Sequence, residues 1–240
     1  IAEWIRVNID EAGFGRESIF VNHGTGRNIS SWVPFLGGAC LGTPNIGAIG
    51  FSGYSCYLPR TCGTAAGIGD FPIVDASEGH ADRYANPEWV RPDVVVIWGC
   101  EPLKSNADGF LGHWLVQCVQ MGSKVISVDP RLTWWGARAA FWLPVRPGTD
   151  AVVAMAMLKV ICDEKLYDQE FCDKWVYGLE AVCERVAEMD LAELCERAWV
   201  SVEDVQRVAR TYAAAKPAAI QWGVALDQQT GGQQAAHAVT

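Results

Sequence analysis

The sequence predicts an α/β protein in which a mostly parallel, doubly wound sheet is preceded by part of a second α/β domain. Three observations predict this fold. Short apolar runs alternate with helical patterns from residue 92 onward. Three of these runs, 93–98, 124–128 and 218–223, end at turn-forming residues. The runs are apolar at almost every position, as in strands that are buried on both faces of a parallel sheet.

The first part of the chain has a less regular pattern. Residues 1–12 predict an amphipathic helix, residues 18–23 a strand and residues 30–41 a helix. Residues 42–88 are rich in Gly, Pro, Ser and Thr and show little periodicity. A segment of this length without regular structure is usually functional when it lies inside a compact chain.

The second part predicts a regular series of elements that together suggest a Rossmann-like sheet. The strand 93–98 leads to a helix near 105–122 and a strand at 124–128. The remaining predicted elements are a short strand at 141–145, a helix at 149–164, two further helices of which the second opens at Ser201, and a strand at 218–223.

These patterns divide the chain into three segments. Residues 1–88 are expected to form the first segment of a substrate-side α/β domain, and residues 89–217 a Rossmann-like domain that binds a nucleotide. Residues 218–240 are expected to be a truncated return segment. Because the chain begins and ends within helical patterns and lacks a first methionine, we expect it to be an excerpt of a longer protein.

Composition restricts the classes of partner. Lysine and arginine total 19 against 28 acidic residues, a formal net charge of −9, and no basic run is present. This balance argues against nucleic acid and anionic membranes as partners, so local donors must hold any bound anion. Nine cysteines are present without one Cys-x-x-Cys pair, which excludes a zinc ribbon or a complete iron–sulfur run within these residues. No transmembrane segment is predicted.

A glycine turn follows the first predicted strand. Gly24 and Gly26 lie between that strand and the helix 30–41, a geometry that presents backbone N–H groups to phosphate. Ile29 stands where a third glycine would complete the dinucleotide fingerprint. An ordinary nicotinamide site is therefore disfavoured, also because no acidic residue ends the following strand.

Polar and turn-forming residues follow the later strands. Asp129 and Arg131 come directly after one strand, and the turn Pro147–Asp150 follows the next. The carboxyl ends of strands in an open α/β sheet are where ligands bind. An aspartate and an arginine beside such a turn can read a purine edge and a phosphate together. The sequence therefore predicts a site for a large, nucleotide-bearing molecule.

Four blocks of this region resemble the molybdopterin oxidoreductase family of the dimethyl sulfoxide reductase type. The blocks are Trp98–Pro102, Val128–Thr133, Arg146–Asp150 and Gln221–Gly223. The resemblance implies an enzyme that binds bis-molybdopterin guanine dinucleotide with molybdenum or tungsten. It also implies that these loops hold the guanine, ribose and pyrophosphate of the cofactor. The residues to which this role is carried are Trp98, Gly99, Cys100, Glu101, Asp129, Arg131, Gly148, Thr149, Asp150, Trp222 and Gly223, with Gly24 and Gly26 of the first turn. The family usually has asparagine where Glu101 stands.

The segment 42–62 is similar to the active-site loop of the thiosulfate, polysulfide and arsenate reductase branch of this family. The similarity implies that Cys56 is the protein ligand of the metal, with Cys62 as the second choice, since a thiolate is a soft donor. Arg60 and Arg27 would then donate to an anionic or oxygen-bearing substrate. The alternative interpretation is that both thiols are structural and Arg60 is a surface residue.

The resemblance implies transfer of an oxygen atom or hydroxyl group to or from a small oxyanion or a catechol-type aromatic substrate. It also implies a 4Fe–4S cluster in an upstream part of the protein and an iron–sulfur electron-transfer subunit as partner. Two alternatives stay open: a non-redox hydratase or transhydroxylase of the same family, and a scaffold that keeps the fold without the metal. The protein is expected in the cytoplasm, or folded and exported to the periplasm or cell envelope.

Overall fold

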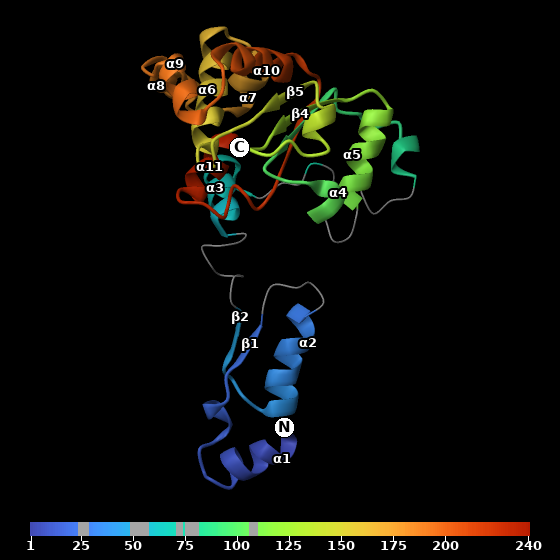
Figure 1. Cartoon of the computed structure of the whole chain (residues 1–240), viewed down its shortest axis with the longest axis vertical. Helices are drawn as coiled ribbons and strands as arrows, with labels where there is room; N and C mark the ends of the chain where they lie inside the picture. Colours follow the sequence, from blue (N-terminus) through green and yellow to red (C-terminus); the bar gives the residue numbers. More distant parts are fainter. Residues whose placement is uncertain (24–28, 49–57, 71–73, 75–81, 106–109) are drawn as a thin grey trace. The chain divides into compact units, whose positions relative to one another are not determined.

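The computed structural model describes the chain in two compact units, Ile1–Leu58 and Pro59–Thr240 (Figure 1). The residues that it describes are 1–23, 29–48, 58–70, 74, 82–105 and 110–240. The domain boundaries predicted at residues 88 and 217 stay predictions.

The first unit holds a small parallel sheet. Its strands are β1 (Val21–His23) and β2 (Ile46–Ala48), and Val21 lies opposite Ile46. The helical elements are α1 (Ala2–Ile5), a π-helical turn (Arg6–Asp10), a 3-10 turn (Arg16–Ser18), α2 (Ile29–Phe35) and a second π-helical turn (Leu36–Leu41). The helix, strand and helix predicted for residues 1–41 are present in that order, although β1 is shorter than predicted and β2 was not predicted.

The second unit is built on a parallel sheet of four strands in the order β5-β4-β3-β6. These strands are β3 (Val94–Trp98), β4 (Lys124–Val128), β5 (Phe141–Leu143) and β6 (Ala218–Trp222). The chain passes from β3 outward through β4 to β5 and then returns to the other side of β3. This is the order of the first four strands of the Rossmann fold, so the predicted fold class is confirmed.

Helices cover both faces of this sheet. The connection from β3 to β4 contains α4 (Pro102–Ser105) and α5 (Phe110–Gln120), and the stretch after β4 contains a 3-10 turn (Gly136–Arg138). Five helices lie between β5 and β6: α6 (Asp150–Asp163), α7 (Gln169–Trp175), α8 (Leu179–Ala187), α9 (Leu191–Ala198) and α10 (Val202–Ala214). The last helix is α11 (Gly232–Val239).

Two expectations about helices were wrong. We expected two helices between residue 164 and β6, but four are present, because Asp168 and Asp190 each cap a new helix by accepting backbone N–H bonds. We also expected no regular structure in 42–88, but β2, α3 (Leu58–Ile68) and a 3-10 turn (Arg83–Ala85) lie there. Two glycines inside α3 hide its pattern, and packing against α11 stabilises it instead.

The alternation of side chains along β3 divides the core in two. Val94, Val96 and Trp98 face a cluster that includes α6, α9 and α10, whereas Val95 and Ile97 face α5. All five residues of β3 are buried, as expected for the central strand of a doubly wound sheet. The two clusters hold the sheet between layers and so fix where its strands end.

The strand register brings the carboxyl ends of the four strands into one row. Trp98 pairs with Val128 on one side and with Trp222 on the other, and Val128 pairs with Leu143. The residues that follow the strands therefore emerge together along one edge of the sheet. The strands that follow β3 are added on one side of it as far as β5, and β6 is then added on its other side. The crevice between β3 and β6 at this edge therefore lies at the topological switch point.

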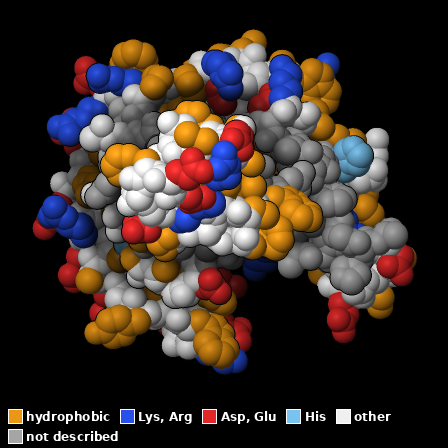
Figure 2. All heavy atoms as spheres, turned by 90° about the horizontal axis from the view of Figure 1, so that it is seen from below, with side chains coloured by type: hydrophobic (Ala, Val, Ile, Leu, Met, Phe, Trp, Pro, Cys, Tyr) orange, Lys and Arg blue, Asp and Glu red, His pale blue; other side chains and the backbone are white. Residues whose placement is uncertain are grey.

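The surface carries charges of both signs. On the face shown in Figure 2, acidic and basic side chains are interspersed rather than gathered by sign. In the first unit, Arg6 pairs with Glu3 and Arg16 with Asp10. Within the described part of the chain, no helix combines the length and the apolar character that crossing a bilayer requires.

Candidate functional site

The switch-point edge of the sheet carries a pocket of about 510 Å³. Three turns line it: Gly99–Glu101 after β3, Arg131–Thr133 after β4, and residues 224, 225 and 228 after β6. Lys104 and Ser105 of α4 complete the wall. The fold thus brings together four of the predicted site residues, namely Gly99, Cys100, Glu101 and Arg131. We call this cavity the switch-point pocket.

The glycines allow two of these turns to approach each other closely. Gly99 has a φ of +58°, and a Cβ atom there would lie 2.8 Å from the Cβ of Ala225. A Cβ atom on Gly223 would lie 2.5 Å from the Cβ of Cys100. Any larger residue would push the turn after β6 away from the turn after β3. These two glycines therefore shape the pocket through backbone packing.

Cys100 lies in the wall of the pocket as a buried thiol. Its Sγ donates to the carbonyl oxygen of Gln221 at 3.4 Å. Burial, with smaller effects from the Asp129 and Glu101 carboxylates, raises the pKa of the thiol to about 12. A thiol with this pKa stays protonated at neutral pH, and a protonated thiol is a poor nucleophile.

Asp129 and Arg131 form the turn after β4. The Asp129 side chain is buried, and its Oδ1 accepts from the backbone N–H of Arg131 at 2.8 Å. The indole of Trp142 donates to the Asp129 carbonyl at 2.8 Å. The Arg131 side chain is 75% exposed and lies 3.5 Å from the Asp129 carboxylate through Nε. The turn is therefore rigid at its base, while its guanidinium is available to an anion at the pocket.

The predicted Gly148–Asp150 turn is not part of the pocket wall. Gly148 has a φ of +84°, and the Thr149 hydroxyl donates to the Arg146 carbonyl at 2.7 Å. Asp150 begins α6 and is buried. Its Oδ1 accepts from the Trp98 indole at 2.7 Å and its Oδ2 from the Gln229 amide at 2.9 Å. The carboxylate thus ties the end of β3 to α6 and to the turn after β6.

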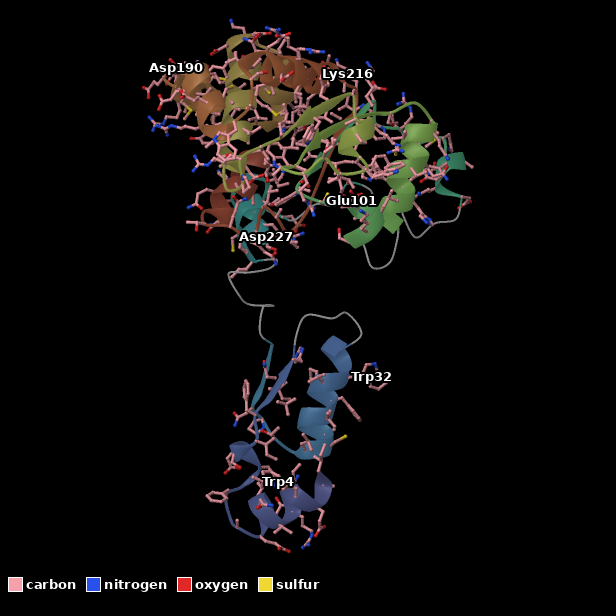
Figure 3. All side chains as sticks on the ribbon, in the orientation of Figure 1. Trp4, Trp32, Glu101, Asp190, Lys216 and Asp227 are labelled. Atoms are coloured by element: carbon pink, nitrogen blue, oxygen red, sulfur yellow. The ribbon has the colours of Figure 1, made fainter. Side chains whose placement is uncertain are left out.

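Glu101 differs from these acidic residues. It is 7% exposed, and neither carboxylate oxygen has a hydrogen-bond partner among the described residues. Figure 3 shows it at the start of α4, on the side of the second unit that carries the strand ends. A buried carboxylate without donors is unfavourable by several kcal/mol. Such a group in a pocket wall marks a position where a bound molecule would supply the donors.

Arg60, predicted to contact substrate, is paired in the structure. It lies in α3, and its Nε is 2.6 Å from Oδ2 of Asp227, while its backbone N–H donates to Oδ1 at 2.8 Å. Asp227 is fully buried, and Arg60 also lies 5.7 Å from the Trp222 ring, the site residue at the end of β6. Asp227 was not predicted from the sequence, because no local pattern marks an acid 167 residues from its partner.

α3 is fastened to α11 as well. The His237 ring nitrogen Nδ1 lies 3.0 Å from the Gly63 carbonyl oxygen. A Cβ atom on Gly63 would lie 2.5 Å from the Gln233 carbonyl oxygen, so only glycine permits this approach. Cys62, the second-choice ligand, is exposed on this helix. Cys56, Gly24 and Gly26 lie outside the described residues, and within the described ranges no three His, Cys, Asp or Glu side chains form a metal-binding group.

The fold and the pocket define an α/β protein with a candidate ligand pocket at the switch point of a Rossmann-type sheet. Comparison with known proteins identifies the family. The family model for molybdopterin oxidoreductases matches residues 56–240, so the chain belongs to the molybdopterin oxidoreductase family.

The chain is 38% identical over 115 residues to acetylene hydratase of Syntrophotalea acetylenica, an alignment that covers 48% of this chain and 16% of that protein. It is 36% identical over 108 residues to the thiosulfate reductase molybdopterin-containing subunit PhsA of Salmonella typhimurium, covering 45% and 14%. The solved structure of acetylene hydratase from Pelobacter acetylenicus matches with a TM-score of 0.70 and 26% identity, over 99% of this chain and 30% of that one. The chain therefore spans less than a third of the length of these relatives.

Proposed function

We propose that this chain forms a nucleotide-binding segment of a bis-molybdopterin guanine dinucleotide enzyme that carries molybdenum or tungsten. The observation that carries the proposal is the convergence of three strand-end turns on the switch-point pocket. Its volume of about 510 Å³ lies in the range of small-molecule and cofactor sites.

The residues of the pocket fit the nucleotide part of such a cofactor. Arg131 and Lys104 line the pocket and supply cationic donors for a diphosphate. Such local donors are needed because the net charge of the chain is negative. Glu101 supplies an acceptor without a partner in the protein. Gly99 and Gly223 let the turns approach closely enough to enclose a ligand between them. Asp129 and Asp150 hold the turns in place rather than reaching into the pocket.

The bound cofactor would supply a redox-active metal held by dithiolene sulfurs, and the protein would supply orientation and electrostatics. Cys56 is the proposed metal ligand, and Cys62 is the second choice. The buried Arg60–Asp227 pair would hold α3 in a fixed position. On this proposal Arg60 has a positioning role in α3, and its contact with substrate stays a prediction.

We further propose transfer of an oxygen atom or hydroxyl group to or from a small oxyanion or a catechol-type aromatic. A 4Fe–4S cluster in another part of the whole protein and an iron–sulfur subunit would carry the electrons, either in the cytoplasm or after export of the folded protein. PhsA is named as a thiosulfate reductase subunit, which supports the oxyanion class.

A hydratase is the second candidate function. It is favoured by the similarity to acetylene hydratase in both sequence and structure. A third possibility, a scaffold without metal, has no support from these relatives, which are named as enzymes.

Analysis of the whole protein tests these proposals. Purified protein should contain molybdenum or tungsten, and acid hydrolysis should release two guanine nucleotides per metal atom. A protein without either metal would be a scaffold, and the proposal would fail. Turnover of thiosulfate, polysulfide, arsenate or catechols with a reduced viologen dye would indicate the reductase. Hydration of an alkyne without net consumption of electrons would indicate the hydratase.

The metal ligand is tested by two matched variants of the whole protein. Cys56→Ser should change the ligand field of the metal, seen by electron paramagnetic resonance, and abolish turnover while guanine nucleotide remains bound. Cys62→Ser should leave the spectrum unchanged. The reverse result would assign the ligand to Cys62.

A further inference from the structure

Glu101 is a buried acceptor that the protein itself does not satisfy. Its carboxylate oxygens have no partner among the described residues, although Ser105 and Lys104 line the same pocket. The Ser105 hydroxyl donates instead to the backbone carbonyl of Glu101 at 2.9 Å. The other acidic residues at this edge of the sheet, Asp129 and Asp150, are satisfied. The missing donors must therefore come from outside these residues.

Because residue 101 is a glutamate, only certain ligands can supply its missing hydrogen-bond donors. An asparagine at this position, which resemblance to the family leads us to expect, presents one acceptor and one donor group. A carboxylate presents acceptors at both oxygens and no donor. Glu101 is thus suited to a ligand with two adjacent donors and is repelled by phosphate oxygens. Arg131 and Lys104 are the groups of the same pocket that attract phosphate.

Guanosine carries two such pairs of donors. The N1–H and the exocyclic amine lie side by side on the base, and the ribose carries neighbouring hydroxyl groups. We propose that Glu101 accepts two hydrogen bonds from one of these donor pairs in the guanosine of the pterin cofactor. This inference rests on the proposed function and assigns a contact with the guanosine to Glu101.

The proposal is tested on the whole protein, prepared without cofactor from a host that cannot make molybdopterin. Calorimetry would measure the binding of GMP, of IMP, which lacks the exocyclic amine, and of 2′-deoxy-GMP. Glu101→Gln keeps the size of the side chain but loses one acceptor, and should weaken GMP binding by about 10- to 100-fold. Glu101→Asn should bind more weakly than wild type as well, because it too keeps only one acceptor. Glu203→Gln, a change at an exposed glutamate of α10, should leave affinity unchanged.

The choice of nucleotide shows which donor pair is used. If wild type discriminates against IMP and Glu101→Gln does not, the base is bound. If wild type binds 2′-deoxy-GMP more weakly than GMP and Glu101→Gln does not distinguish the two, the ribose is bound. Equal binding of all three nucleotides by wild type, or GMP affinity of Glu101→Gln within twofold of wild type, would overturn the inference.

The protein with cofactor gives an independent measurement. Guanine nucleotide released per metal atom should fall in Glu101→Gln relative to wild type, and unchanged content would count against the inference. Failure of the proposed function would look different, because the wild-type protein would then contain neither metal nor guanine nucleotide.

Discussion

The turns after β3 and β5 carry two carboxylates that are equally buried but differently used. Glu101 and Asp150 are each 7% exposed, and each follows the carboxyl end of a strand of the same sheet. Asp150 accepts from Trp98 and from Gln229, while Glu101 has no hydrogen-bond partner in the part of the chain that the structure describes. Burial therefore does not separate a structural acid from a ligand-binding one. The complete set of hydrogen-bond partners does.

The comparison extends to Asp227. This side chain is buried more deeply than the other two, and its partner is the charged guanidinium of Arg60. Of these three acids, Asp150 is satisfied by neutral donors, Asp227 is satisfied by a cation, and Glu101 has no hydrogen-bond partner among the described residues. The first two fasten α6 and α3 to the sheet and its return segment. The third is free to serve the ligand. Replacing each of these three acids in turn tests the distinction between structural and ligand-binding carboxylates.

The largest effect is expected from Asp227→Ala. This change leaves the Arg60 guanidinium, only 12% exposed, without its carboxylate, and should lower the free energy of unfolding by about 3–5 kcal/mol. Chemical denaturation of the whole protein would measure the loss. Asp163→Ala, which removes a surface partner of Lys159, should cost about 1 kcal/mol or less. Replacing Arg60 and Asp227 together by leucine should recover much of the loss, and equal losses in single and double variants would contradict the pairing.

Asp150→Leu is expected to have the second largest effect. The change leaves the buried indole N–H of Trp98 without an acceptor, so the free energy of unfolding should fall by about 1–3 kcal/mol. Asp150→Asn keeps an acceptor for the indole and should lose less. Denaturation of the cofactor-free protein would measure both, and a silent Asp150→Leu would show that the bond contributes nothing.

Glu101→Met applies a matched change to the unsatisfied carboxylate and should act with the opposite sign. It removes a buried acceptor that has no partner, so the cofactor-free protein should gain about 1 kcal/mol in unfolding free energy. The same variant should gain less stability from added cofactor than wild type does. A loss of stability in the cofactor-free variant would show that Glu101 has a partner within the protein.

The smallest and most local test concerns Cys100. Burial raises the pKa of this thiol from 9.0 to about 12, so at pH 8 the reactive thiolate is about a thousandfold rarer in the native protein than in the unfolded chain. Alkylation followed by mass spectrometry should label Cys100 slowly in native protein and rapidly in urea. Native labelling should rise as the pH rises toward 12. Rapid native labelling at pH 8 would show that the turn after β3 is open.

Much of the fold could be predicted because β3, β4 and β6 are short apolar runs between polar turns. Their pattern is local, and a buried parallel strand needs nothing more to be recognised. The helices between β5 and β6 were undercounted because Asp168 and Asp190 were not recognised as caps. α3 was missed because its glycines contradict helix propensity, and the contact of Gly63 with α11 that requires glycine is not visible in sequence.

The sequence alone determined where most of the strands lie along the chain, which turns end them and which types of residue those turns contain, because these features depend on neighbouring residues. It also carried the resemblance that led to the family. The tertiary structure decided how each polar residue is used. Arg60 meets Asp227 across 167 residues, Asp150 meets Trp98 across 52, and the Glu101 carboxylate meets no donor within the described ranges. Hydrogen-bond satisfaction depends on atoms brought together from distant segments, and local sequence does not encode that proximity.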